Sequence, residues 1–258
     1  MITFDRVTKK LGGRNVLDNV SFEIARGETC VIVGLSGAGK SVTLKHMVRL
    51  MTPDSGEVRI DGDVISRAHG RELERIRRRF GFLFQNAALL QWMSVFENVA
   101  LPLREKTKMR EDEIRKTVME KLALFNMQDA AGKIPADLSG GMQKRAGIAR
   151  AIVMNPEIIL YDEPTSGLDP VMSRQIDKLI NNLRETLGAT SVVVTHDLHS
   201  ALTIGTRIMM VDGGHVVENA APKDFINSKN ETVQRFLESQ YITRRGSWEK
   251  GKEYVRAE

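Results

Sequence analysis

A glycine-rich stretch at residues 34–41, GLSGAGKS, constrains this chain more than any other part of its sequence, because it fits the pattern G-x-x-x-x-G-K-[ST]. The apolar run Thr29–Val33 before it predicts a buried parallel strand, and residues 42–51 after it predict a helix. A strand, a glycine turn and a helix bring free backbone N–H groups and the positive end of a helix dipole to one point. The stretch therefore predicts a phosphate-binding loop in an α/β fold.

Every residue of this loop is a candidate contact for nucleotide phosphates. The eight residues are Gly34, Leu35, Ser36, Gly37, Ala38, Gly39, Lys40 and Ser41. The glycines let the backbone approach a phosphate closely. Lys40 is expected to reach the β- and γ-phosphates, and the Ser41 hydroxyl is expected to bind Mg²⁺. The alternative is a chance glycine-rich turn, and the strand and helix on either side argue against it.

A second acidic element follows an apolar run at residues 158–161. A central strand ending there would place the carboxylates of Asp162 and Glu163 beside the phosphates. Asp162 is expected to bind Mg²⁺ through water, and Glu163 to activate the attacking water. A pair of surface acids is the alternative, but the upstream loop and the following Pro164 favour a catalytic site.

Hydrophobic patterns divide the first part of the chain into two kinds of region. Residues 2–24 and 58–60 predict antiparallel strands on either side of the phosphate loop. Residues 86–155 predict a helical subdomain. A capping box at Ser94 begins its first helix, and Pro102 is expected to limit that helix.

The α/β pattern resumes after this helical segment. Strands are predicted at residues 158–161 and 191–194, with a helix between them from the N-cap Asp169 to Leu187. Residues 208–217 predict a hairpin at the sheet edge. The chain therefore predicts an α/β core with an antiparallel β subdomain and an inserted helical subdomain.

Composition selects a partner only weakly. Lys and Arg number 38 against 33 Asp and Glu, and the net charge of +5 suits nucleic acid or a membrane face without selecting either. The basic residues 71–79 lack interleaved aromatic residues and favour a solvated helix face over a nucleic-acid patch. The lone Cys30 excludes an internal disulfide and favours a buried structural thiol.

Neither a signal peptide nor a membrane span is predicted, since no apolar run approaches roughly 18 residues. We therefore expect a soluble, reduced and cytoplasmic protein. Any membrane process would need a second polypeptide to supply the membrane part.

The segment Leu138-Ser139-Gly140-Gly141-Met142 predicts a second helix start suited to an anion. One chain thus carries two helix starts of this kind. If they lie far apart in one subunit, both can contact the same nucleotide only when two chains face each other.

Taken in order, these motifs resemble the nucleotide-binding subunits of ABC transporters over about the first 225 residues. Six segments carry the resemblance: Walker A at 34–41, the Q-loop Gln85, the signature at 138–142, Walker B at 158–162 with Glu163, the D-loop at 166–169 and the switch His196. The resemblance implies a P-loop NTPase ABC nucleotide-binding domain with a RecA-like core, at residues 1–225, followed by a C-terminal extension at 226–258.

The resemblance also implies a transport-coupled ATP hydrolase that works as a homodimer. Each ATP would lie between one Walker A loop and the other subunit's Ser139, Gly140 and Gly141. Asp169 of the other subunit would couple the two sites.

Within one subunit the resemblance assigns further roles. Glu163 would polarise the water, and His196, which alone would more often be structural, would hydrogen-bond the γ-phosphate. Gln85 would contact Mg²⁺ and the water and would sense the membrane partner.

Two positions depart from the family pattern. Leu11 stands where an aromatic residue usually stacks on adenine, so that Leu11 and Val16 are expected to pack on the base instead. Met142 ends the signature where glutamine is commonest.

Residues 84–90 and 94–105, with Lys144-Arg145 after the signature, are similar to the ATPases of Mce-domain lipid transporters, including the Mla phospholipid system. This resemblance implies an integral membrane permease docked near residues 85–105, an Mce-domain lipid-binding protein and a small regulatory subunit. It implies that the protein has no nucleic-acid partner. It also implies a peripheral location on the cytoplasmic face of the inner membrane.

Other interpretations stay open. Amino-acid importers, methionine-type ones included, have similar segments, and a soluble ABC ATPase of ribosomes or DNA usually carries two cassettes. A non-hydrolysing regulatory cassette conflicts with the presence of Glu163 and His196. The tail from residue 241 is either an arm that packs on the sister subunit or a disordered segment.

Overall fold

The computed structural model describes residues 1–35 and 37–240. The expectations for Ser36 and for the tail from residue 241 onward lie outside the described residues. A four-stranded antiparallel sheet has the order β2-β1-β4-β5. Its strands are β1 (Ile2–Leu11), β2 (Arg14–Ile24), β4 (Ser55–Ile60) and β5 (Asp63–Val64).

A second sheet forms the centre of the molecule in the order β10-β9-β3-β8-β7-β6, and all its pairs are parallel except β10 with β9. Its strands are β3 (Thr29–Val33), β6 (Phe80–Leu83), β7 (Ile158–Asp162), β8 (Thr190–Val194), β9 (Arg207–Asp212) and β10 (His215–Ala220). Strands β3, β7 and β8 are buried along their whole length, as parallel strands covered on both faces must be. Because β3 and β7 both run parallel to β8, their carboxyl ends meet at one edge of the sheet.

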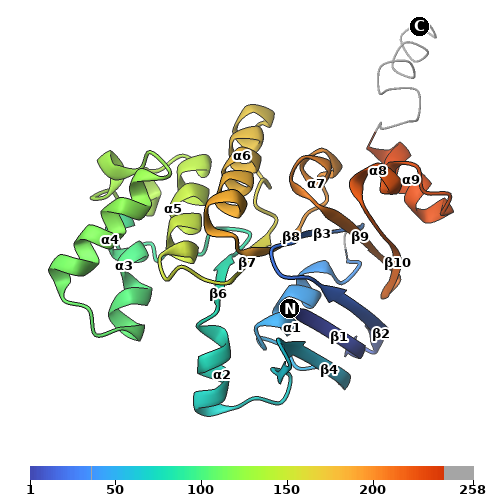
Figure 1. The fold of residues 1–258 in the computed structure, drawn as a ribbon. Helices are drawn as coiled ribbons and strands as arrows, with labels where there is room; N and C mark the ends of the chain where they lie inside the picture. The colour runs from blue at the N-terminus through green and yellow to red at the C-terminus, as the bar shows by residue number, and fades with distance from the viewer. Residues whose placement is uncertain (36, 241–258) are drawn as a thin grey trace, which may run out of the picture.

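Helices surround this sheet, with α3, α4 and α5 at one end of the molecule and α8 and α9 at the other (Figure 1). The helices are α1 (Lys40–Met47), α2 (Gly70–Arg77), α3 (Val95–Lys106), α4 (Glu111–Ala123), α5 (Gly140–Ile152), α6 (Pro170–Leu187), α7 (Leu198–Ile204), α8 (Pro222–Ile226) and α9 (Glu231–Ser239). Across the described ranges, none of them combines the length and apolarity needed to cross a membrane.

Two hydrophobic clusters meet at strand β3, because its side chains alternate between the two faces of the sheet. Val31 and Val33 join the cluster formed with α3 to α7. Cys30 and Ile32 join the cluster shared with the antiparallel sheet and α1. Cys30 is a free, buried thiol, and burial raises its pKa to about 12, which confirms the predicted structural role. The α/β core with an antiparallel sheet is likewise confirmed.

Two helices differ from the predicted ranges. Helix α1 begins at Lys40 and ends at Met47, because Arg49 has a φ of 53° and the N–H groups of Leu50 and Met51 turn back to the carbonyl of Lys45. The helix was expected over residues 42–51.

The expectation that Pro102 limits the preceding helix is wrong, since α3 continues to Lys106. Leu103 is buried just beyond the proline, and the N–H and hydroxyl of Thr107 cap the Leu103 carbonyl at 3.0 and 2.7 Å. Arg104 pairs with Glu111 at the start of α4. These contacts offset the backbone hydrogen bond that a proline removes.

Candidate functional site

The turn from β3 into α1 requires glycine at two positions. Gly34 has a φ of 151°, and a Cβ there would lie 2.3 Å from the Val211 carbonyl oxygen. Gly39 has a φ of 97°, and a Cβ there would lie 2.6 Å from the Val16 carbonyl oxygen. Neighbouring backbone therefore holds the loop at both ends, and only glycine avoids the clash.

Lys40 is the first residue of α1, and its ammonium group turns back toward the start of the loop. Its Nζ donates to the carbonyl oxygens of Gly34 at 2.8 Å and Leu35 at 3.0 Å. Burial lowers the pKa of Lys40, and the nearby charges of Glu163 and Asp162 oppose that shift. A cation is thus held against the backbone of the loop.

The start of α1 and the end of β7 meet through one hydrogen bond. Ser41 Oγ donates to Asp162 Oδ1 at 2.9 Å. A hydroxyl and a carboxylate fit Mg²⁺, which protein sites commonly hold through one or two side chains together with substrate phosphates. No group of three His, Cys, Asp or Glu residues suited to a metal occurs within residues 1–35 and 37–240. The donor set therefore suits a metal that arrives with a nucleotide.

Glu163 stands next to this pair in a strained conformation. Its φ is 50°, which is uncommon for a residue with a side chain, and its N–H donates to the Val194 carbonyl at 2.9 Å. Its carboxylate Oε2 lies 2.8 Å from Nδ1 of His196, whose side chain is otherwise largely exposed. The predicted water-activating group and the predicted switch residue therefore contact each other within one chain.

One pocket, of about 400 Å³, brings together most of the residues predicted to contact the nucleotide within one chain. It is lined by Leu11, Val16, Gly37, Ala38, Gly39, Lys40, Ser41, Val42, Gln85 and Glu163. Leu11, at the end of β1, and Val16, in β2, therefore reach the phosphate loop as an apolar pair. We call this the nucleotide pocket.

The four residues expected to act across a dimer are not among those that line this pocket. Ser139 is the N-cap of α5 and accepts from the N–H of Met142 at 3.3 Å, ahead of Gly140 and Gly141. Asp169 is the N-cap of α6 and accepts from two N–H groups of that helix. Both helix starts are preformed by their caps, and neither lines the nucleotide pocket of the same chain.

No sequence pattern places Lys144 near the nucleotide pocket. Its side chain is 5% exposed, and its Nζ donates to the backbone carbonyl oxygens of Gln85 and Glu163. These partners lie 59 and 19 residues away along the chain. In the sequence, Lys144 is notable only for its place after the signature, in a segment similar to the ATPases of lipid transporters.

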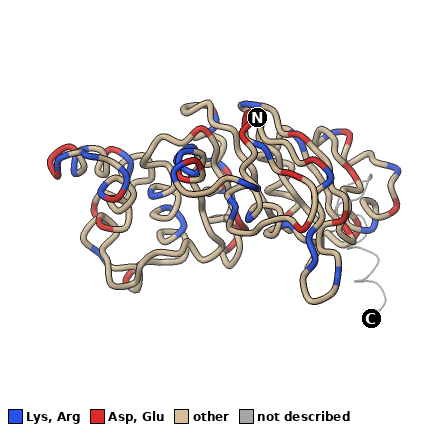
Figure 2. Tube along the Cα trace, turned by 90° about the horizontal axis from the view of Figure 1, so that it is seen from below, with Lys and Arg blue, Asp and Glu red and all other residues tan. Residues whose placement is uncertain are grey.

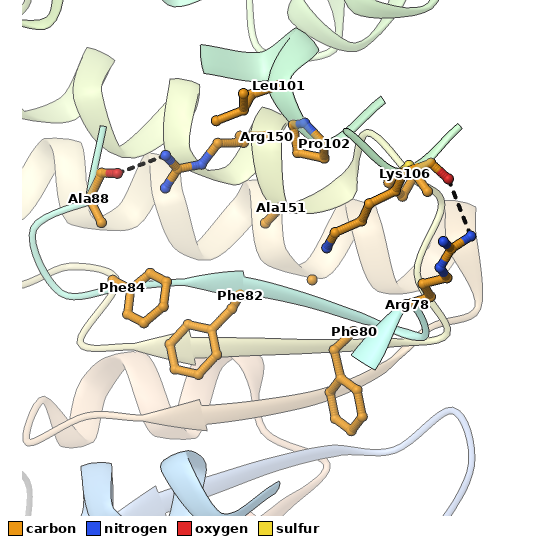
Figure 3. A pocket seen from close by; sticks show the side chains of 12 residues that line it. Arg78, Phe80, Phe82, Phe84, Ala88, Leu101, Pro102, Lys106, Arg150 and Ala151 are labelled. Carbon is orange, nitrogen blue, oxygen red and sulfur yellow. Dashed lines mark hydrogen bonds between the residues drawn. The ribbon is translucent and has the colours of Figure 1, made fainter. Parts of the chain in front are cut away.

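A second pocket, the aromatic groove, lies between the edge strand β6, helix α3 and the end of α5 (Figure 3). It is lined by Arg78, Phe80, Gly81, Phe82, Phe84, Ala88, Leu101, Pro102, Lys106, Arg150, Ala151 and Met154. The rings of Phe82 and Phe84 stack with their centroids 4.1 Å apart. Arg150 and Arg78 donate to the carbonyls of Ala88 and Lys106 at the groove's edges.

The sequence pattern of the family described as ABC transporter matches residues 17–166. The probable ribonucleotide transport ATP-binding protein mkl of Mycobacterium tuberculosis is 41% identical over 257 residues, which cover 100% of this chain and 72% of that protein. The intermembrane phospholipid transport system ATP-binding protein MlaF of Haemophilus influenzae is 38% identical over 93% of this chain and 91% of its own length.

A third relative carries another cargo in its name. The methionine import ATP-binding protein MetN of Carboxydothermus hydrogenoformans is 45% identical over 222 residues, or 86% of this chain and 66% of that protein. Among solved structures, the dimeric post-hydrolysis state of the ATP-binding cassette MJ0796, bound to ADP and Pi, matches with a TM-score of 0.79 and 39% identity. That match covers 86% of this chain and 99% of MJ0796, and it confirms the predicted fold class.

Proposed function

The chain belongs to the ABC transporter family, and we propose that it hydrolyses ATP to drive phospholipid transport between membranes. The match to MlaF supports this cargo most directly, because it extends over 93% of this chain and 91% of MlaF. Methionine import is the second candidate, supported by 45% identity to MetN over 66% of that protein. The ribonucleotide in the name of mkl is a further cargo that the experiment below distinguishes.

The phosphate loop and Lys40 would bind the nucleotide. Backbone N–H groups of the loop and the start of α1 would contact the phosphates, and Lys40 would neutralise charge on the β- and γ-phosphates. Ser41, Asp162 and Gln85 would hold Mg²⁺. The ion would neutralise the negative charge that develops on the phosphates during hydrolysis. Leu11 and Val16 would pack against the adenine.

Glu163 would act as the general base for hydrolysis. Its carboxylate would accept a proton from the water that attacks the γ-phosphorus, while the leaving ADP takes the electrons of the broken P–O bond. The contact at 2.8 Å with His196 supports a role for this histidine in orienting the carboxylate. His196 would also donate to the γ-phosphate.

A homodimer would complete each site. Ser139, Gly140, Gly141 and Asp169 lie outside the nucleotide pocket of their own chain, yet both helix starts are capped and preformed. In a dimer of two facing copies, these residues of one copy would reach the γ-phosphate bound in the pocket of the other copy. The dimeric state of MJ0796 with ADP and Pi supports this arrangement.

The aromatic groove would receive an integral membrane permease. Its Phe82, Phe84, Leu101 and Pro102 offer apolar area, while Arg78 and Lys106 supply charge at its rim (Figure 3). The chain would then lie peripherally on the cytoplasmic face of the inner membrane. An Mce-domain lipid-binding protein and a small regulatory subunit are the further partners we propose.

Charge does not favour a nucleic-acid partner instead. Figure 2 shows Lys and Arg interspersed with Asp and Glu along the described trace, and the formal net charge is +5. Electrostatic binding to nucleic acid relies on a concentrated basic surface.

We also propose that residues 1–225 form the ATPase unit, with a helical subdomain at about 86–155, and that residues 226–258 extend it. Within this extension, α9 buries Val233, Phe236 and Leu237 against the core cluster.

Affinity purification of the full chain from detergent-solubilised native membranes tests the cargo. Mass spectrometry of the co-purifying proteins and lipids should find a polytopic permease, an Mce-domain protein and phospholipid. Recovery of a periplasmic amino-acid-binding protein in their place would overturn the phospholipid proposal and support methionine import.

A further inference from the structure

Lys144 joins two segments that end at the nucleotide pocket. Its Nζ donates to the carbonyl of Gln85, just after strand β6, and to the carbonyl of Glu163, just after β7, at 3.0 Å for the second contact. Gln85 and Glu163 both line the nucleotide pocket. One ammonium group therefore fixes the backbone of the two residues against each other.

The chemistry of this contact makes it hard to replace. Burying an ammonium is costly unless its N–H groups find acceptors, and charge-assisted hydrogen bonds are about twice as strong as neutral ones. Burial lowers the pKa of Lys144, while the charges of Glu163 and Asp162 favour the protonated form. Because Glu163 has a φ of 50°, a bond that holds its carbonyl also supports a strained backbone.

The face of α5 that carries Lys144 also contacts the chain on either side of Gln85. A Cβ at Gly147 would lie 2.8 Å from Leu83 Cδ1 and 3.0 Å from Ala87 Cβ, so the helix and the segment are in close contact. Arg150 donates to the carbonyls of Ala87 and Ala88 at 2.6 and 2.7 Å. Positions 144, 147 and 150 follow one another at helical spacing.

We propose that Lys144 is a positioning residue for ATP hydrolysis, which holds Gln85 and Glu163 in register and ties both to the helix that begins after Ser139. Any shift of α5 as its first turn engages a nucleotide would move the backbone of both residues. This inference rests on the proposed roles of Glu163 and Gln85.

Three substitutions separate positioning from simple stability. Lys144→Met keeps most of the unbranched side chain and removes the donor, Lys144→Gln keeps a neutral donor, and Lys144→Arg keeps the charge. The matched control is Lys121→Met. Lys121 is a half-buried lysine of helix α4, and its Nζ donates to Oδ1 of Asn155 at 2.6 Å. For each purified full-length chain, kcat, KM, the Kd of a fluorescent ATP analogue and the melting temperature are measured.

Lys144→Met loses both hydrogen bonds of the ammonium group, and its kcat should fall by at least roughly 10- to 100-fold. The Kd of the analogue should change by less than about threefold, because the phosphate contacts of the loop are intact. Lys144→Gln and Lys144→Arg should recover part of kcat, and Lys121→Met should keep it. If Lys144→Met does not fold, a lowered kcat of Lys144→Gln at unchanged Kd supports the inference, and a wild-type kcat contradicts it.

A wild-type kcat in Lys144→Met would overturn the inference. So would a loss of kcat that follows the fall in melting temperature equally in all three variants. Glu163→Gln in the same assay keeps the two proposals apart, because an active Glu163→Gln variant overturns the catalytic assignment itself.

Discussion

Phe84 and Gln85 are consecutive in the chain, yet Phe84 lines the aromatic groove and Gln85 lines the nucleotide pocket. The two pockets are therefore separated by a single peptide unit. A partner that displaces Phe84 must move Gln85 as well. This relationship gives the groove a physical means of affecting hydrolysis.

Phe84→Ala should weaken binding to the membrane permease without weakening nucleotide binding. The substitution removes apolar area from the groove, while the phosphate loop keeps its contacts. Recovery of the permease from solubilised membranes should fall several-fold, and the Kd for ATP should stay within about twofold of wild type. Leu124→Ala is the control, because Leu124 is an exposed apolar residue just beyond α4, outside both the groove lining and residues 85–105. Equal recovery with both variants would contradict the docking role.

Lys40→Ala should lose affinity for ATP. The Lys40 ammonium is the cation that we propose for the β- and γ-phosphates, and bonds to charged groups contribute about 1.5–3 kcal/mol, or roughly 10- to 100-fold in Kd. Isothermal titration calorimetry measures the change. Lys45→Ala on the same helix removes an exposed lysine and should leave Kd unchanged. Tight binding by Lys40→Ala would remove Lys40 from the site.

Glu163→Gln should nearly abolish hydrolysis while preserving ATP binding. The amide keeps the shape of the side chain but cannot accept the water's proton, and a general base contributes about 10²–10⁴-fold. With ATP and Mg²⁺ the variant should accumulate as a dimer in size-exclusion chromatography with light scattering. Glu185→Gln, at an exposed position on α6, is the control. Normal turnover by Glu163→Gln would exclude it as the base.

Local patterns predicted the elements that carry the site. The run Thr29–Val33 and the cap at Asp169 each have their cause within a few residues of the chain. The order of motifs then predicted which strand ends would meet, and the hydrogen bond from Ser41 to Asp162 joins two of them.

Features that depend on distant packing were not predictable in the same way. Pro102 alone argues for the end of a helix, and only the burial of Leu103 and the pair from Arg104 to Glu111 explain why α3 continues. In the sequence, Lys144 appears only as part of the Lys144-Arg145 segment after the signature. Its role depends on carbonyls of Gln85 and Glu163, which no local pattern brings close to it.

Leu11→Tyr should tighten ATP binding if the adenine packs where we propose. Leu11 lines the nucleotide pocket beside Val16 and is 40% exposed, so an aromatic ring there can extend over the base. Aromatic stacking contributes about 0.5–1.5 kcal/mol beyond burial, which corresponds to a roughly two- to tenfold lower Kd. Leu50→Tyr, at an exposed leucine just beyond α1, controls for a general effect of added aromatic surface. Calorimetry with ATP and with inorganic triphosphate separates base from phosphate contacts: the gain should appear with ATP alone. An unchanged or weaker affinity for ATP would place the adenine elsewhere.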